Sequence, residues 1–131
     1  KDIVINFNTE EVHYVNSDTE QLNRVFINLL KNSIESLKEK HQKTGDFQKK
    51  IDVEIQLIND YISIVVQDNG TGFTNNDLKT LSKPYFTTKK EGSGLGLSIV
   101  EKILNDHNGF IEFISQKEGA KIKILLPKYV N

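Results

Sequence analysis

Two asparagines are the first residues in the sequence whose types and spacing could do chemistry together. Asn28 and Asn32 lie four residues apart in a segment with helical periodicity, so they are neighbours on one edge of the expected helix, away from its apolar stripe. An amide oxygen can bind a hard cation such as Mg²⁺ without adding charge, which leaves the charge of the metal for phosphates. Asparagine is a mediocre helix former. The pair therefore indicates either such a site or a plain solvated face, and Glu35 lies on the same edge.

An aspartate followed by glycines forms the second candidate. In QDNGTGF, Asp68 comes at the end of a predicted strand, and Gly70 and Gly72 follow it. An ionised aspartate only accepts hydrogen bonds, so Asp68 would select a ligand edge that carries an exocyclic amine, such as adenine. The two glycines would leave backbone that a flat ligand can approach. The alternative is an ordinary turn of the Asp-Asn-Gly type.

A polar segment and a run of glycines follow. PYFTTKK, residues 84–90, reads either as a polar loop or as a mobile flap whose lysine meets phosphate. In EGSGLGLSIV, residues 91–100, three glycines feed a helix, and the free N–H groups at a helix start form an anion site. The spacing excludes the dinucleotide-binding pattern, because Leu97 stands where a further glycine is required. A bare flexible loop remains the alternative to a phosphate site.

The longest predicted element is a helix over residues 18–40. Its start carries a capping box, with Ser17 as the N-cap and Glu20 three residues later. Residues 38–50 are polar and without period, which indicates a helix end and a solvated loop. The helix carries one apolar stripe at helical spacing. Its members are Leu22, Val25, Phe26, Leu29, Leu30, Ser33 and Leu37.

Strands and shorter helices complete the chain. Asn59-Asp60 marks a tight hairpin turn, and Asn108-Gly109 marks a helix C-cap. Apolar alternation predicts extended segments over 2–7 (a half-buried strand), 11–15, 51–58, 61–68, 110–115 and 120–127. Further helices are predicted over 75–82 and 95–107. This order predicts an α/β fold, a two-layer sandwich with one mixed, mainly antiparallel sheet and about three helices on one face.

The composition is that of an ordinary globular domain. The 131 residues, 37% hydrophobic and 27% charged, are assigned to a single domain over 1–131. A net charge of −1 argues against a nucleic-acid partner. The absence of cysteine is compatible with a reducing compartment, and no apolar run approaches the ~20 residues of a membrane span. The chain starts at Lys1 without a methionine, so we expect it to be part of a longer protein.

Four motifs occur in one order and spacing. NLLKNSIE, DNGTGF, PYFTTK and GSGLGL resemble the N, G1, F and G2 boxes of the sensor histidine kinase ATP-binding domain. PYFTTK followed by GSGLGLSIV and a closing GAKIKILLP is most similar to the nitrogen-regulation-type sensor kinases. The resemblance implies the Bergerat fold, which gyrase and MutL ATPases share, with residues 73–91 as an ATP lid.

The resemblance also implies a role for each matching residue. Asn32 would bind Mg²⁺, while Asn28 would line the phosphates and act in catalysis. Lys89 would reach the γ-phosphate as the second catalytic residue, and Asp68 would read the adenine amine. Further residues would contact ATP. They are Gly70 and Gly72 beside the base, Thr87 and Thr88 in the lid, and Gly92, Ser93, Gly94, Leu95, Gly96 and Leu97 around the phosphates.

Three departures from the family pattern matter. Asn28 replaces the glutamate of hydrolysing relatives, and an amide is no general base, so we expect phosphoryl transfer rather than rapid hydrolysis. Ala120 lacks the hydroxyl that many members carry there, and Glu35 replaces a phosphate-facing lysine. None of the histidines has the context of a phosphoacceptor, and each is expected to be structural or on the surface. They are His13, His41 and His107.

The resemblance implies a domain that binds ATP and Mg²⁺ and transfers the γ-phosphoryl group to a histidine on a separate upstream domain. A response regulator would then act downstream. We expect this chain to be a cytoplasmic monomer, whereas its parent would be a homodimer that can be membrane-anchored. A related Bergerat-fold ATPase or an anti-sigma-type serine kinase is the alternative function. A binding module that has lost nucleotide is the third.

Overall fold

The computed structural model describes residues 3–9, 15, 17–72, 93–115 and 118–128. The side chains of residues 93–97 and 115 lie outside this description. Five strands and two helices occupy the described residues. They are β1 (Ile3–Thr9), α1 (Thr19–Thr44), β2 (Lys49–Ile58), β3 (Tyr61–Asp68), α3 (Ser93–Asp106), β4 (Phe110–Ser115) and β5 (Ala120–Pro127).

The strands form one sheet in the order β1-β2-β3-β5-β4. The pairing of β1 with β2 is parallel, and the other three pairings are antiparallel. The predicted hairpin is confirmed, since Ile58 pairs with Tyr61 and Asn59 adopts the left-handed conformation, with φ 55°. The mixed, mainly antiparallel sheet expected from the sequence is therefore present.

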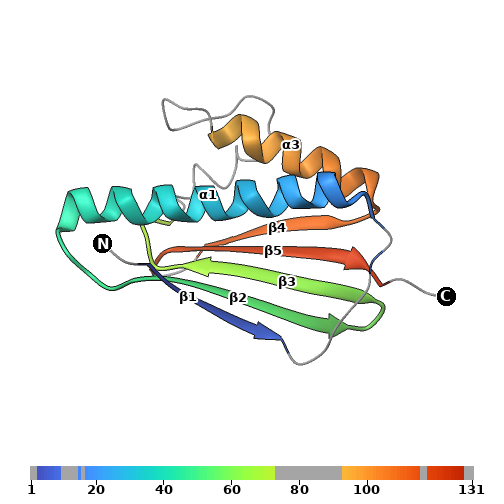
Figure 1. Cartoon of the computed structure of the whole chain (residues 1–131), viewed down its shortest axis with the longest axis horizontal. Coiled ribbons are helices and arrows are strands. Elements are labelled where there is room, and N and C mark those ends of the chain that lie inside the picture. Colours follow the sequence, from blue (N-terminus) through green and yellow to red (C-terminus); the bar gives the residue numbers. More distant parts are fainter. Residues whose placement is uncertain (1–2, 10–14, 16, 73–92, 116–117, 129–131) are drawn as a thin grey trace.

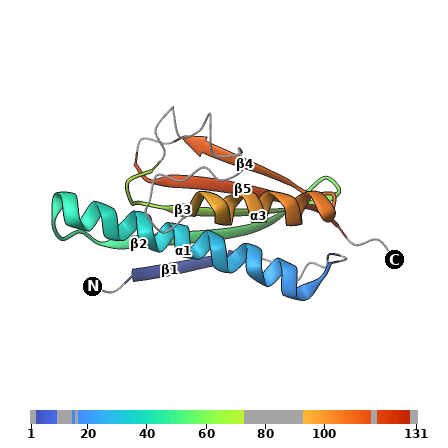
Figure 2. The ribbon, with the colours of Figure 1, turned by 90° about the horizontal axis from the view of Figure 1, so that it is seen from above.

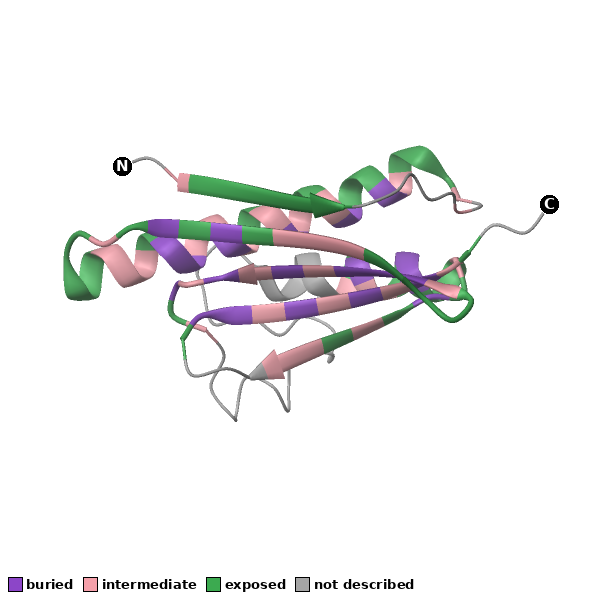
Figure 3. Cartoon of the chain, turned by 90° about the horizontal axis from the view of Figure 1, so that it is seen from below, coloured by how far each residue is buried: buried purple, intermediate pink, exposed green. Residues whose placement is uncertain are grey.

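Both described helices lie on one face of the sheet, which gives two layers (Figure 1, Figure 2). The core lies between these layers, and Figure 3 shows buried residues alternating along the central strands. Fully buried members come from both layers, among them Val25, Leu29, Leu37, Ile51, Val100 and Ile124. The two-layer α/β prediction is thus confirmed. The predicted helix over 75–82, most of the segment over 11–15 and the lid over 73–91 lie outside the described residues.

The strand β1 differs from its prediction. Apolar alternation predicted a half-buried strand over 2–7, but β1 runs over Ile3–Thr9 and its residues after Ile3 are exposed. Ile5 is 56% exposed and Phe7 63% exposed. The reason is the position of β1 at the edge of the sheet, where among the described strands only β2 pairs with it.

The first helix begins one residue later than predicted. The N-cap is Asp18, not Ser17, and its Oδ1 accepts a hydrogen bond from the Gln21 N–H at 3.2 Å. A carboxylate is an acceptor that also interacts favourably with the positive end of the helix. The sequence offered two adjacent capping residues, and the structure uses the charged one.

Replacing Asp18 with alanine should therefore lower the free energy of unfolding by about 1 kcal/mol, because the Gln21 N–H loses its acceptor. Urea unfolding followed by circular dichroism measures this change. Ser17→Ala is the matched control and should leave the unfolding midpoint almost unchanged. A larger loss in Ser17→Ala than in Asp18→Ala would contradict the assigned cap.

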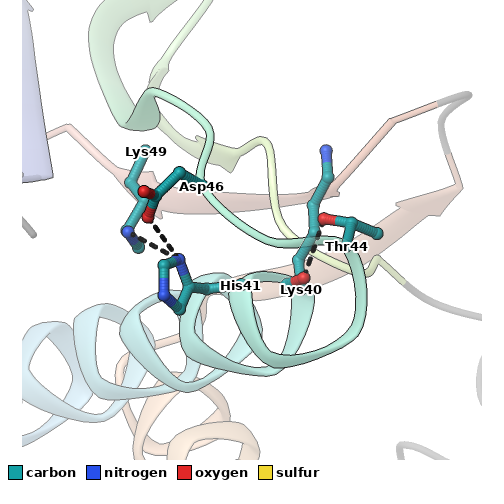
Figure 4. Close-up of polar contacts among 5 residues, drawn as sticks. All are labelled: Lys40, His41, Thr44, Asp46 and Lys49. Atoms are coloured by element: carbon teal, nitrogen blue, oxygen red, sulfur yellow. Dashed lines mark hydrogen bonds and ion pairs between the residues drawn. The ribbon is translucent and has the colours of Figure 1, made fainter.

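The same helix ends later than predicted. It continues to Thr44, and Gly45, with φ 86°, closes it by donating its N–H to the His41 carbonyl. His41 therefore lies in the helix and not in a loop. Its Nδ1 atom lies 3.4 Å from Lys49 Nζ and 3.4 Å from Asp46 Oδ1 (Figure 4). These contacts join the helix end to the start of β2.

The second described helix, α3, runs antiparallel to α1 (Figure 1). His107, directly after α3, ties the two helices together, because its Nε2 accepts the Asp18 N–H at 3.0 Å. Its Nδ1 then carries the proton and donates to the Ile103 carbonyl at 2.8 Å. The predicted C-cap is confirmed, with Asn108 at φ 59° and a buried Gly109 beside the Leu125 carbonyl.

Candidate functional site

A buried carboxylate ends the strand β3. Asp68 is only 4% exposed. Three donors reach its Oδ1 atom. The Gly70 N–H lies at 2.8 Å, the Ala120 N–H at 3.3 Å and the Ser36 hydroxyl at 3.4 Å. The carboxylate is therefore held by the turn after β3, by the start of β5 and by α1.

Burial raises the pKa of Asp68 above its ordinary value, because removal from water disfavours the charged form. Hydrogen bonds oppose this effect. The backbone donors at Gly70 and Ala120 lower the pKa, and so do the hydroxyls of Ser33 and Ser36. Buried ionisable groups with perturbed pKa values are typical of functional sites. Asp68 is thus the described residue that best meets the expectation of a ligand-reading acid.

Three glycines around Asp68 are packed against the backbone of the protein itself. A Cβ atom at Gly70 would lie 2.6 Å from the Ser36 carbonyl carbon. One at Gly72 would overlap the Gly119 oxygen, and one at Gly119 would overlap the Asp68 oxygen. This packing explains why glycine is needed at Gly70 and Gly72. Their predicted role in making room for a base stays a prediction.

Asn69 fixes the turn to the neighbouring strand. Its side-chain oxygen accepts the Lys50 N–H, and its side-chain nitrogen donates to the Gln48 carbonyl, both at 2.8 Å. From the other side, Lys40 Nζ donates to the Asn69 carbonyl at 2.9 Å. The backbone that follows Asp68 is therefore fastened both to β2 and to α1.

The two asparagines of α1 lie on its flank, half-buried. Asn32 is one helical turn before Ser36, the residue that contacts Asp68. The Nδ2 atom of Asn32 is buried, and it makes no hydrogen bond in the described structure. Buried amide groups nearly always have partners in proteins. Among the described residues, the Nδ2 atom of Asn32 therefore lacks the partner that such groups usually have.

The start of α3 and Asn32 lie the same number of residues from the contact that joins the two helices, between His107 and Asp18. The two helices are antiparallel and are joined where His107 meets Asp18. The 14 residues of α3 span about 21 Å, and the same count along α1 from Asp18 leads to Asn32. The first four N–H groups of α3, from Ser93 to Gly96, have no acceptors within the helix. Free N–H groups at a helix start can bind an anion.

The predicted glycine loop is thus helical for most of its length. We predicted a helix from about Leu95, whereas α3 begins at Ser93. A helical start still supplies free N–H groups, so the phosphate hypothesis depends on the same backbone. The structure packs Asp68 and Gly70 against Ser36 of α1, one helical turn after Asn32 and two after Asn28, and it places Gly72 against Gly119. Thr87, Thr88, Lys89 and Gly92 lie outside the described residues.

Sequence reasoning missed two hydroxyls beside Asp68. Ser33 was placed in the apolar stripe as a small core residue, and Ser36 was not singled out. Both are buried, although serine is mostly an exposed residue. The available signal was their spacing of three residues, which puts two polar side chains on the buried face of one helix.

The comparison with known families agrees with this geometry. The profile of the family described as "Histidine kinase-, DNA gyrase B-, and HSP90-like ATPase" matches residues 17–130. The chain belongs to this family, as the four motifs indicated.

Individual relatives are sensor kinases. The chain is 38% identical over 118 residues to a putative sensor histidine kinase NtrY-like from Rickettsia conorii. It is also 35% identical over 116 residues to sporulation kinase A from Bacillus subtilis. These matches cover 89% and 88% of this chain but only 18% of each relative.

The solved catalytic domain of the histidine kinase ThkA, in a nucleotide-free form, has the same fold. Its TM-score is 0.77 at 30% identity, over 97% of this chain and 78% of that one. The resemblance to sensor histidine kinases inferred from the sequence is therefore supported both by relatives and by structure, and the NtrY-like relative supports the nitrogen-regulation type.

Proposed function

We propose that this chain is the catalytic domain of a sensor histidine kinase. It binds Mg-ATP and transfers the γ-phosphoryl group to a histidine on a separate domain. The observation that carries the proposal is the buried Asp68 carboxylate, which is bonded to Ser36 of α1, with the buried Nδ2 atom of Asn32 one turn earlier on the same helix. Family membership and the names of the relatives support the same function.

Asp68 would select adenine. The hydrogen bonds from Gly70, Ala120 and Ser36 all end on Oδ1. Within the part of the chain that the structure describes, no hydrogen bond to Oδ2 is made, and this oxygen would accept the exocyclic amine. An ionised carboxylate cannot donate, so a base that presents an acceptor at this edge would be rejected. The contact from Ala120 comes from its backbone N–H, so it does not depend on the side chain at this position.

The phosphates would lie between Asn32, Asn28 and the start of α3. The described residues contain no group of three acidic, histidine or cysteine side chains that could hold a metal alone. In nucleotide sites, Mg²⁺ usually joins one or two protein oxygens to substrate phosphates. Asn32 would supply its Oδ1 to the ion and its lone Nδ2 to a phosphate oxygen. Bound Mg²⁺ neutralises charge on the phosphate oxygens.

Residues of the lid complete the proposal. Thr87, Thr88 and Lys89 would contact the phosphates, with Lys89 as a point charge on the γ-phosphate. Asn28 would orient a phosphate oxygen and would leave water inactive, because an amide cannot take its proton. The chain would therefore keep ATP for transfer and act mainly by positioning.

The acceptor histidine would belong to another domain. His41 and His107 make contacts that hold α1 in place, as described above. We expect a monomer for this chain, a homodimer for its parent and a response regulator downstream. Neither described helix has the apolar length needed to cross a membrane.

Labelled ATP distinguishes the functions. The chain is incubated with γ-labelled ATP, Mg²⁺ and the acceptor-histidine domain of an NtrY-like relative. Kinase function predicts an acid-labile, base-stable phosphate on the acceptor and little free phosphate. Release of phosphate without an acceptor would instead support the ATPase. An acid-stable label on serine would support the serine kinase.

A further inference from the structure

A hydroxyl on α1 links the Asp68 carboxylate to the turn that follows it. Ser36 Oγ accepts the Thr71 N–H at 2.9 Å and lies 3.2 Å from the Thr71 hydroxyl. The same atom lies 3.4 Å from Asp68 Oδ1. Since an ionised carboxylate only accepts, the Ser36 proton points to Asp68, and the Thr71 hydroxyl donates to Ser36.

The packing leaves this arrangement little freedom. Ser36 is buried, and a Cβ atom at Gly70 would overlap its hydroxyl. The turn therefore lies directly against α1, and Ser36 is the side chain at the point of contact. A hydrogen bond to a charged acceptor is stronger than one between neutral groups.

We propose that Ser36 is a positioning residue of this site. Its hydroxyl holds Oδ1 of Asp68 and the Thr71 amide in one arrangement and so keeps Oδ2 directed toward the ligand amine. The inference rests on the proposed nucleotide function and adds a residue to it. Ser33, buried on α1 three residues before Ser36, is a second hydroxyl that lowers the pKa of Asp68.

Charged groups on the surrounding elements do not replace this contact. Lys40 on α1 bonds the Asn69 carbonyl, and Lys49 on β2 faces His41 and the Phe47 ring. Neither lysine is among the groups that shift the pKa of Asp68, whereas the Ser36 hydroxyl lowers that pKa. Loss of the hydroxyl should thus raise that pKa further.

The test compares ADP binding by wild type, Ser36→Ala and a control across a pH series, by calorimetry. Carboxyl ¹³C NMR follows the titration of Asp68 in the ligand-free chain. Ser63→Ala is the control, because Ser63 is equally buried but lies on the opposite face of β3. Asp68 must be ionised to accept the amine, so binding is lost as pH falls through its pKa.

Ser36→Ala should bind ADP roughly tenfold more weakly at neutral pH. In Ser36→Ala, the pH at which ADP binding is lost and the pH at which Asp68 titrates should both move to higher values. Ser63→Ala should change neither. Ser36→Ala should fold, because alanine favours the helix. Ser33→Ala serves as a second variant, and its loss of ADP binding at low pH should also move to higher pH.

Unchanged affinity in both serine variants would overturn the positioning role, even if the titration moved. Failure of the proposed function looks different, because the wild type itself would then bind no ADP. In that case the positioning role falls with it.

Discussion

Replacing Asp68 with asparagine should weaken ATP binding by about 3–5 kcal/mol, roughly a hundred- to several-thousand-fold in Kd. The asparagine oxygen can still accept the three donors that now reach Oδ1. Its NH₂ group then replaces Oδ2 and faces the adenine amine, so two donors oppose each other. Calorimetry with a non-hydrolysable ATP analogue measures the change.

The same substitution should leave the fold intact. Burial raises the pKa of Asp68, so the folded state carries a cost for its charge above that pKa, and a neutral amide avoids this cost. We therefore expect a thermal midpoint at pH 7.5 that is equal to or higher than that of the wild type. Asp60→Asn, in the exposed β2–β3 turn, is the control and should bind normally. Tight binding by Asp68→Asn would remove Asp68 from the site.

The sequence predicted those parts of the site that depend on residue type at a defined position. An aspartate at a strand end and two asparagines one helical turn apart can be recognised from residue type and local spacing alone. The hairpin at Asn59 and the C-cap at Asn108 were predicted for the same reason, because their backbone conformations belong to local turn chemistry.

Features that depend on distant neighbours could not be predicted in this way. Nothing in the local pattern shows that Ser36 faces Asp68, since the two residues are 32 apart in the chain. The exposure of Ile5 depends on the position of β1 at the edge of the sheet, which the local pattern does not show. Asp18 rather than Ser17 is the N-cap because the helix begins one residue later than the pattern predicted. The Asp18 N–H is bound by His107, which lies 89 residues away in the chain.

Replacing Asn32 with alanine should lower phosphoryl transfer by on the order of 10²- to 10³-fold. The variant loses the proposed oxygen ligand of Mg²⁺ and the donor to a phosphate oxygen. Adenine recognition at Asp68 remains, so ADP binding without Mg²⁺ should change little, and the dependence of binding on Mg²⁺ should disappear. Transfer of label to an acceptor domain and calorimetry with and without Mg²⁺ measure the two effects.

Stability should move in the opposite direction to activity. The buried Nδ2 atom of Asn32 makes no hydrogen bond in the described structure, and alanine is the best helix former. Removing the amide should therefore raise the free energy of unfolding by about 1 kcal/mol. Asn23→Ala, on the opposite side of α1 and exposed, gains helix propensity alone and should keep full activity. A destabilised but active Asn32→Ala would show that the amide serves the fold, whereas a stabilised and inactive variant shows that α1 sacrifices stability to hold a ligand.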